Sequence, residues 1–178
     1  GDAGVMGLHE QTKAILLGNA VAHHANADGL LALAAWIAEH TGASVGYLCE
    51  AANTVGAPVA GAQPGAGGLN AGQMLSGGLK AALLLHVEPQ HDTAAGAAGA
   101  AALSKAQMVV SLNAFKTNLD IADVLLPVAP FSETSGSFVN AEGRVQGFHA
   151  VVRPLCDTRP AWKVLRVLSN LIGVRSVD

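Results

Sequence analysis

Short apolar runs alternate with longer amphipathic stretches along this chain, which is the pattern of strands separated by helices. The run Ala14 to Gly18 is followed by the segment Asp28 to Thr41, whose apolar residues recur at helical spacing. A second apolar run, Ser44 to Cys49, comes next, and Gly42 stands where a left-handed residue can end the helix. Strand, helix and strand in this order predict a βαβ unit of a parallel sheet.

A second round of the same pattern follows. Ala81 to Val87 and Met108 to Leu112 are apolar enough to be buried strands, and the Ala-rich segment Asp92 to Ala106 between them predicts a helix. Val124 to Val128 predicts one more strand, and Pro127 favours a sheet edge or a strand end because proline donates no backbone hydrogen bond. The two rounds together predict an α/β fold with a Rossmann-like, three-layer parallel sheet.

The last third of the chain has a different character. Ser137 to His149 predicts a β-hairpin, and Gly143 eases the backbone conformation of its turn. Asp157 or Thr158 is then expected to cap a helix that runs through Ile172. The sequence therefore predicts a Rossmann-like domain over residues 13–130, and a hairpin and C-terminal helix over residues 131–178 that pack on it.

Composition narrows the classes of function. Hydrophobic residues make up 51% of the 178 residues and charged residues only 13%, about half the usual share. Two interpretations of this low charge content stay open. Either it reflects the richness of the chain in Ala and Gly, or part of the surface is covered by other protein. The sequence has no cluster of Lys and Arg residues, so nucleic-acid binding is not expected. The longest apolar run, Leu30 to Ala38, is shorter than the roughly 18 residues of a membrane helix, so no membrane insertion is expected.

Cysteine and histidine give no support for a redox or metal centre. Cys49 and Cys156 are too few for the four thiolates of an iron–sulphur cluster, and they lack CxxC spacing. We expect buried, inert thiols, although the sequence leaves a disulfide possible. The seven histidines form no HExxH motif, and exposed or hydrogen-bonded histidines are expected instead. Neither a metal ligand set nor a catalytic residue is predicted.

Two groups of residues are candidates for a ligand site. Gly18 and Asn19 follow the first strand, where parallel sheets bind ligands, but no GxGxxG motif accompanies them. The second group is polar and comprises Glu133, Asn140, Arg144 and Gln146. This group is either a structural network that holds the hairpin or a cradle for a polar ligand, with Arg144 and Gln146 as donors.

Two segments resemble known proteins. Ala122 to Gln146, with the sequence ADVLLPVAPFSETSGSFVNAEGRVQ, resembles the molybdopterin oxidoreductase superfamily. Glu50 to Pro64, which contains Asn53-x-x-Gly56, is similar to the large iron–sulphur subunit of NADH–quinone oxidoreductase (respiratory complex I). The resemblance extends from about Lys13 onward.

The resemblance implies the C-terminal part of the molybdopterin-enzyme-like domain of that large subunit. Such a domain is structural: electrons pass from NADH to quinone through iron–sulphur clusters elsewhere in the parent subunit, and this chain alone is not catalytic and holds no cofactor. The candidate residues are then a vestigial site. The expected partners are other subunits of the peripheral arm, on the cytoplasmic side of the bacterial inner membrane or the mitochondrial matrix side. The alternative is a domain of a molybdenum oxidoreductase that binds molybdopterin guanine dinucleotide.

Overall fold

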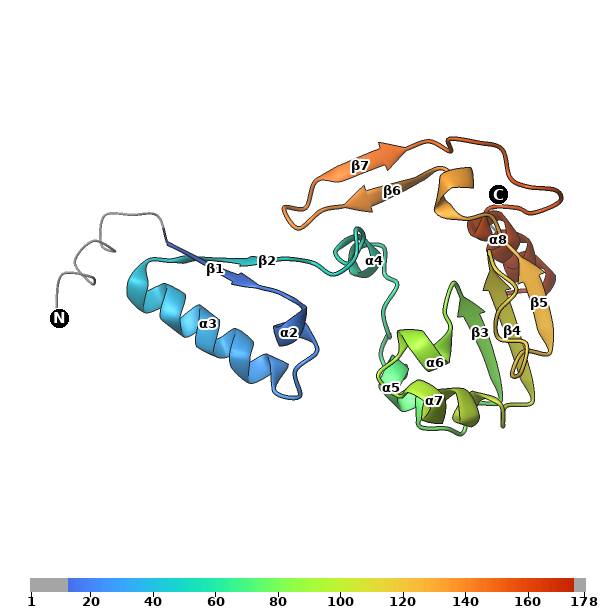
Figure 1. Cartoon of the computed structure of the whole chain (residues 1–178), viewed down its shortest axis with the longest axis horizontal. Coiled ribbons are helices and arrows are strands. Elements are labelled where there is room, and N and C mark those ends of the chain that lie inside the picture. The colour runs from blue at the N-terminus through green and yellow to red at the C-terminus, as the bar shows by residue number, and fades with distance from the viewer. Residues whose placement is uncertain (1–12, 175–178) are drawn as a thin grey trace. The chain divides into compact units, whose positions relative to one another are not determined.

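The computed structural model describes residues 13–174, which form two compact units (Figure 1). The first unit contains the described chain up to Ala62 together with Ser137–Gln146, and the second contains Gln63–Gly136 together with the described chain from Gly147 onward. Each unit has a parallel sheet with helices beside it in sequence, so the predicted α/β class is confirmed. These units are groups of contacting residues, and the domain boundary expected at residue 130 stays a prediction.

The first unit is built on a two-stranded parallel sheet. Strand β1 (Ala14–Leu17) pairs with β2 (Ser44–Tyr47) along its whole length. Between them lie the short helix α2 (Asn19–Ala22) and the long helix α3 (Ala27–Thr41). Gly42 ends α3 at φ 69° and donates its N–H to the Ala38 carbonyl, so the predicted βαβ unit and its glycine stop are confirmed.

The second unit contains a three-stranded parallel sheet in the order β3, β4, β5. These strands are Ala81–Leu85, Met108–Asn113 and Val124–Pro127. Strand β4 is central and carries the most deeply buried side chains, among them Leu112 at 0% exposure. Strand β5 is an edge strand that ends at Pro127, as expected of a residue without a backbone donor.

The helix expected between β3 and β4 is present as α7 (Gly96–Leu103), which is shorter than the predicted span from Asp92 to Ala106. A separate short helix, α6 (Pro89–Asp92), precedes it. Thr93 is extended at φ −125° and Gly96 has φ 51°, which interrupts the helical backbone. The sequence predicted neither α6 nor the later start of α7, because the high alanine content does not reveal a turn set by one glycine.

The connection between the two sheets contains two short helices. Helix α4 (Gly56–Val59) comes first. Helix α5 (Ala71–Leu75) begins with a capping box, in which the Asn70 side chain accepts from the Gln73 N–H and the Gln73 side chain accepts from the Asn70 N–H. The start of α5 is therefore fixed by local hydrogen bonds.

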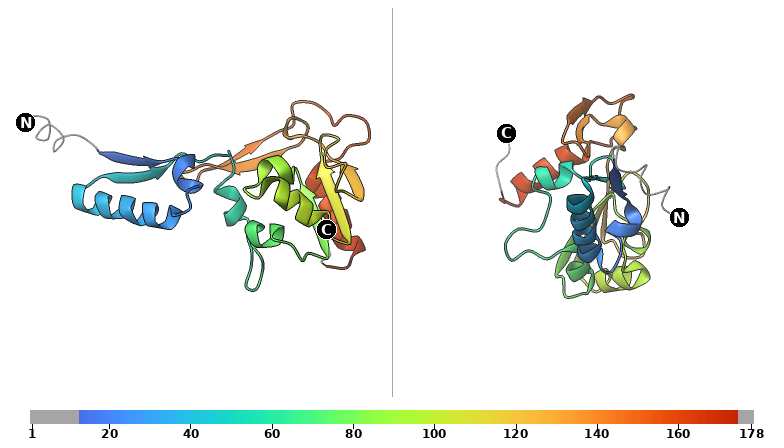
Figure 2. Two further views of the ribbon diagram at one scale, coloured as in Figure 1. Left: turned by 60° about the horizontal axis from the view of Figure 1, so that its bottom comes forward. Right: turned by 90° about the vertical axis from the view of Figure 1, so that its left-hand side faces the viewer.

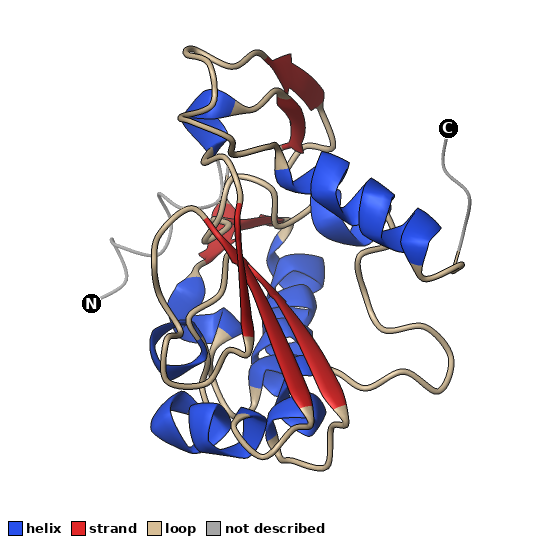
Figure 3. Cartoon of the chain, turned by 90° about the vertical axis from the view of Figure 1, so that its right-hand side faces the viewer, coloured by secondary structure: helices blue, strands red, loops and turns tan. Residues whose placement is uncertain are grey.

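The C-terminal third forms the hairpin and helix that the sequence predicts. After a 3₁₀ turn at Phe131–Glu133, strands β6 (Gly136–Val139) and β7 (Val145–Phe148) run in opposite directions (Figures 1 and 2). Gly143 occupies the turn at φ 79°. In Figure 3, helix α8 (Ala161–Leu171) lies on the side of the β3–β5 sheet opposite to α6 and α7.

Two expectations for this region and for the cysteines are wrong. Neither Asp157 nor Thr158 caps α8: Pro160 occupies the N-cap, and the Thr158 hydroxyl donates to the Leu155 carbonyl instead. Cys49 and Cys156 are exposed and free rather than buried, because both lie in surface segments that follow the regular elements.

Candidate functional site

The first pair of candidates lies at the carboxyl edge of the two-stranded sheet. Gly18 follows β1 with an extended backbone at φ −116°, and α2 begins at Asn19 without a side-chain cap. A Cβ on Gly18 would meet no atom of residues 13–174 within 4 Å, so nothing in that part of the chain requires glycine there. Nearby in the sequence, His23 Nε2 lies 2.7 Å from Glu50 Oε2, which follows β2. This edge is polar and open, and its role in ligand binding stays a prediction.

The hairpin candidates have different surroundings. Asn140 Oδ1 accepts hydrogen bonds from the N–H groups of Glu142 at 3.1 Å and of Arg144 at 2.9 Å, so this side chain shapes the turn. Arg144 lies 3.8 Å from the Glu142 carboxylate, and both side chains are exposed. Gln146 is exposed as well. These contacts support the structural interpretation for Asn140 and leave Arg144 and Gln146 accessible to a ligand.

Glu133 ties two loops of the second unit together. Its Oε2 atom accepts from the Leu155 N–H at 3.0 Å, and nearby Ser135 Oγ accepts from the Ala150 N–H at 3.2 Å. The two bonds hold the segment after β7 against the segment before β6. Glu133 therefore has a structural contact of its own, at a place distinct from the hairpin turn.

The Asn53-x-x-Gly56 spacing has a packing explanation. Asn53 Oδ1 accepts from the Val139 N–H of β6 at 2.9 Å, although 86 residues separate them. A Cβ added to Gly56 would lie 1.9 Å from the same oxygen, so only glycine leaves room for this side chain. The pair attaches the end of β6 to the segment that leads into α4.

A further polar site, which the sequence interpretation missed, lies at the carboxyl ends of β3 and β4. It is a pocket of about 240 Å³ formed by the loops that follow these two strands. Its polar lining residues are Glu88, Gln90, His91, Lys116, Thr117, Asn118 and Asp120. The carboxyl edge of a parallel sheet is the usual place for ligand binding in open α/β folds.

Hydrogen bonds between polar side chains, two of them buried, fix the loop after β4. Asn118 Nδ2 donates to the Val87 carbonyl at 2.9 Å and to Ser111 Oγ at 3.0 Å. Asn113 Nδ2 donates to Thr117 Oγ1 at 3.1 Å. Ser111 and Asn113 are both buried on β4, so these bonds form where water competes little. The loop is thus held by both strands whose ends form the pocket.

The backbone at this edge is held in an uncommon conformation. His86 has φ 51° and Asn118 has φ 58°, which is the left-handed region that non-glycine residues rarely adopt. Such residues cost on the order of 1–3 kcal/mol and tend to gather at functional sites. Asp92 Oδ2 accepts from the Glu88 N–H at 2.7 Å and so fixes the loop after β3 in turn.

The side chains at this pocket can recognise a ligand that has both donors and acceptors. Lys116 supplies a positive charge, Thr117 a hydroxyl, and Glu88 and Asp120 carboxylate acceptors. The signal that could have identified them is in the sequence, because β4 ends in Asn113 and the polar run Lys116, Thr117 and Asn118 begins three residues later. The sequence interpretation named the hairpin residues instead, since they lie in the segment Ala122 to Gln146 that resembles the molybdopterin oxidoreductase superfamily.

The described part of the chain offers neither a metal site nor a membrane span. Among residues 13–174 no group of three or more His, Cys, Asp or Glu residues could hold a metal ion. Within that range, too, no helix is long and apolar enough to cross a bilayer. Some histidines have local partners: His24 Nδ1, for example, accepts from the Asn26 N–H.

Comparisons with known proteins agree on one family. The family model described as molybdopterin oxidoreductase matches residues 6–171. A protein of Staphylococcus aureus (strain USA300) named "Putative formate dehydrogenase" is 36% identical over 74 residues, which are 41% of this chain and 8% of that protein. A protein of the same name from the bovine strain RF122 is 35% identical over 66 residues, or 37% of this chain and 7% of its own length. The match thus spans less than a tenth of either relative.

Proposed function

The chain belongs to the molybdopterin oxidoreductase family, and from this premise we propose that it binds the nucleotide half of a molybdopterin guanine dinucleotide in a molybdenum oxidoreductase. This was the alternative interpretation of the sequence, and the relatives named as formate dehydrogenases favour it over complex I. The whole enzyme's substrate belongs to the same proposal, with a small carboxylate such as formate as the first candidate.

The pocket at the ends of β3 and β4 carries this proposal. Guanine presents N–H donors that suit the carboxylates of Glu88 or Asp120, and a pyrophosphate suits an ammonium group and a hydroxyl. Lys116 forms no ion pair with any residue in the range 13–174, so its charge is available. The Thr117 oxygen already accepts a bond from Asn113, and its own hydrogen can be donated outward. The residues present therefore fit the nucleotide half of the cofactor.

In this proposal the chain binds and orients, while the bound cofactor supplies the redox chemistry at its metal. Asn118 keeps the loop after β4 attached to both strands, so that Lys116 and Thr117 line the pocket. The Asp92 bond to the Glu88 N–H does the same for the loop after β3. Rigid placement lowers the entropy lost when the ligand is bound.

Calorimetric titration of the whole chain with GDP tests the proposal, with ADP as the competing nucleotide. We expect GDP to bind more tightly than ADP, because a carboxylate accepts from the guanine N–H groups and not from adenine in the same orientation. Lys116→Ala should weaken GDP binding about tenfold or more, since it removes a charge-assisted hydrogen bond. Lys105→Ala is the matched control, because Lys105 is exposed and lies outside the pocket. A flat titration at millimolar GDP would dispose of the proposal.

A structural role in complex I is the second candidate, favoured by the segment Glu50 to Pro64 and its Asn53-x-x-Gly56 spacing. Its partners would be other subunits of the peripheral arm, and its location the cytoplasmic side of the bacterial inner membrane or the mitochondrial matrix side. This candidate expects no nucleotide binding and a parent protein with iron–sulphur clusters. A natural reading frame that encodes molybdenum-enzyme sequence upstream, together with GDP binding, would count against it.

A further inference from the structure

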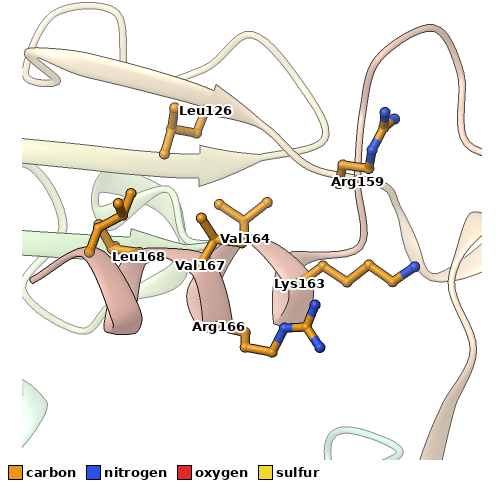
Figure 4. Close-up of a pocket in the computed structure, with 8 residues that line it drawn as sticks. Leu126, Arg159, Lys163, Val164, Arg166, Val167 and Leu168 are labelled. Atoms are coloured by element: carbon orange, nitrogen blue, oxygen red, sulfur yellow. The ribbon is translucent and has the colours of Figure 1, made fainter. Parts of the chain in front are cut away.

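An apolar groove lies between α8 and the edge strand β5 in the second unit. It has a volume of about 470 Å³. Figure 4 shows Leu126 of β5 above Val164 and Val167 of α8, with Leu168 further along the helix. Leu171 extends the apolar lining to the end of α8. This groove is separate from the proposed nucleotide pocket, with which it shares no lining residue.

The apolar residues that α8 contributes to the groove have the spacing of a single helix face. Val164, Val167, Leu168 and Leu171 recur at intervals of three and four residues, so they form one stripe along α8. Val167 remains 51% exposed and Leu171 80% exposed, so neither side chain is covered by the second unit. A helix that lays an apolar stripe of the same spacing into the groove would bury both.

Three cations flank this stripe. Arg159, Lys163 and Arg166 also line the groove, and they too are separated by four and three residues. None of them forms a salt bridge with an acidic residue in the described range 13–174. All three are exposed, and Figure 4 shows Arg159 and Lys163 near the start of α8.

These cations lie near the N-terminus of α8, which is an unfavourable position for positive charge when the helix has no binding partner. The positive end of the helix dipole is at the N-terminus, where anions are preferred and cations are repelled. Pro160 gives no side-chain cap there, and the first turn of α8 contains no acidic residue. A carboxylate supplied from outside would meet both the dipole and the three side-chain charges.

We propose that this groove docks an amphipathic helix of a partner protein that carries Asp or Glu along one flank. The partner's apolar stripe packs on Leu126, Val167 and Leu171, and its carboxylates pair with Arg159, Lys163 and Arg166. Opposite charge along one flank also fixes the direction in which the helix lies, because the cations gather toward the N-terminal half of α8.

A protein helix suits these residues better than a membrane surface. Binding to anionic lipid typically needs a cluster of about 4–8 basic residues, and this groove has the three named above. Its apolar part also lies between a strand and a helix, with Leu126 on the strand side, whereas an interfacial helix presents a convex face to lipid.

Two designed helical peptides test the proposal. Both carry leucine at positions i, i+3, i+4 and i+7; one has glutamate along the flank and the other lysine. Binding is followed by the fluorescence of Trp162 in a Trp36→Phe background, since Trp162 lies beside Lys163 and Arg166 and the chain has two tryptophans. The glutamate peptide should bind at least about tenfold more tightly than the lysine peptide.

Charge reversal gives the decisive comparison. The double variant Lys163→Glu and Arg166→Glu should exchange the preference of the two peptides, and Val167→Asp should weaken both. Lys105→Glu is the control, because Lys105 is exposed and lies outside the groove. Circular dichroism verifies that each variant remains folded. Equal affinity for the two peptides, no binding at millimolar peptide, or tighter binding to phosphatidylserine vesicles would each overturn the proposal, and GDP binding is unaffected in every case.

Discussion

The two parallel sheets differ in how well they bury their own apolar side chains. In the second unit β4 has a neighbour on each side, and its Val109 and Leu112 are almost completely buried. In the first unit both strands are edges, and Leu16 remains 61% exposed while Trp36 on α3 remains 57% exposed. A sheet therefore needs a central strand, or a covering partner, before an apolar run becomes core.

The contrast also bears on the low charge content of the chain. Large apolar side chains are exposed on the first unit and along α8. The sequence alone left two interpretations of the low charge content open: richness in Ala and Gly, or a surface that other protein covers. Exposed apolar residues in such number favour the interpretation in which other protein covers part of the surface. The first unit should accordingly be the less stable of the two when the chain is studied alone.

The largest expected effect is that of Leu112→Ala. This side chain is fully buried at the centre of the three-stranded sheet, and its truncation should lower the free energy of unfolding by about 2–5 kcal/mol. Urea denaturation followed by circular dichroism measures the change. The matched variant Leu16→Ala should cost less than about 1 kcal/mol, because that side chain is exposed. Equal losses would show that the first sheet is as well buried as the second.

Asn118→Ala should have the next largest effect. It removes the bonds to Val87 and Ser111 and puts alanine at φ 58°, so a loss of roughly 2–3 kcal/mol is expected. Asn118→Gly separates the two causes, since glycine tolerates the backbone and lacks the side chain. Thermal unfolding gives the stability of each variant, and a GDP titration gives its affinity. If Asn118→Ala is as stable as the parent chain, the loop is not held as described.

Gly42→Ala should cost about 1–2 kcal/mol because Gly42 has φ 69° at the end of α3. Gly18→Ala is its control within the same unit: its backbone is extended, and a Cβ there meets no atom of the described residues within 4 Å. If the two units unfold in separate transitions, Gly42→Ala should shift the less stable one and Leu112→Ala the other. Hydrogen exchange resolved by residue assigns the transitions. A shift of both transitions by either variant would contradict the separation.

The smallest effect is expected at two exposed side chains of the first unit, Leu16 and Tyr47. Leu16→Ser and Tyr47→Ser should each change stability by no more than about 0.5 kcal/mol, as is usual for exposed sites. They should also raise the concentration up to which the isolated chain stays monomeric, which analytical ultracentrifugation measures. A stability loss above about 2 kcal/mol would show that these side chains are buried in solution.

Much of the secondary structure could be predicted because its causes are local. Apolar runs located five strands, Gly42 was placed at a left-handed helix end, Gly143 was placed in the hairpin turn, and Pro127 was placed at a sheet edge or strand end. Errors occurred where a local signal was absent or ambiguous. One was the start of α7, which begins at Gly96 rather than at Asp92, and another was the start of α8, where Pro160 rather than Asp157 or Thr158 is the N-cap.

The candidate site was harder to predict. The sequence drew attention to Glu133, Asn140, Arg144 and Gln146, and Asn140 proves to shape its own turn. The pocket residues at the ends of β3 and β4 come from segments about 30 residues apart, and no short motif joins them. These residues lie together because β3 and β4 pair in parallel, and a single sequence does not reveal which strands pair.

The sequence by itself determined the α/β class, the order of its elements and the family-like segment, because apolar periodicity, glycine and proline act over a few residues. Only the tertiary structure decided which strand became central, which loops met at a pocket and which cations were left beside an exposed apolar stripe. These outcomes depend on contacts between distant segments, such as Asn118 with Val87 and Asn53 with Val139. Burial and hydrogen bonding at such contacts are properties of the folded chain, and no local pattern of residues contains them.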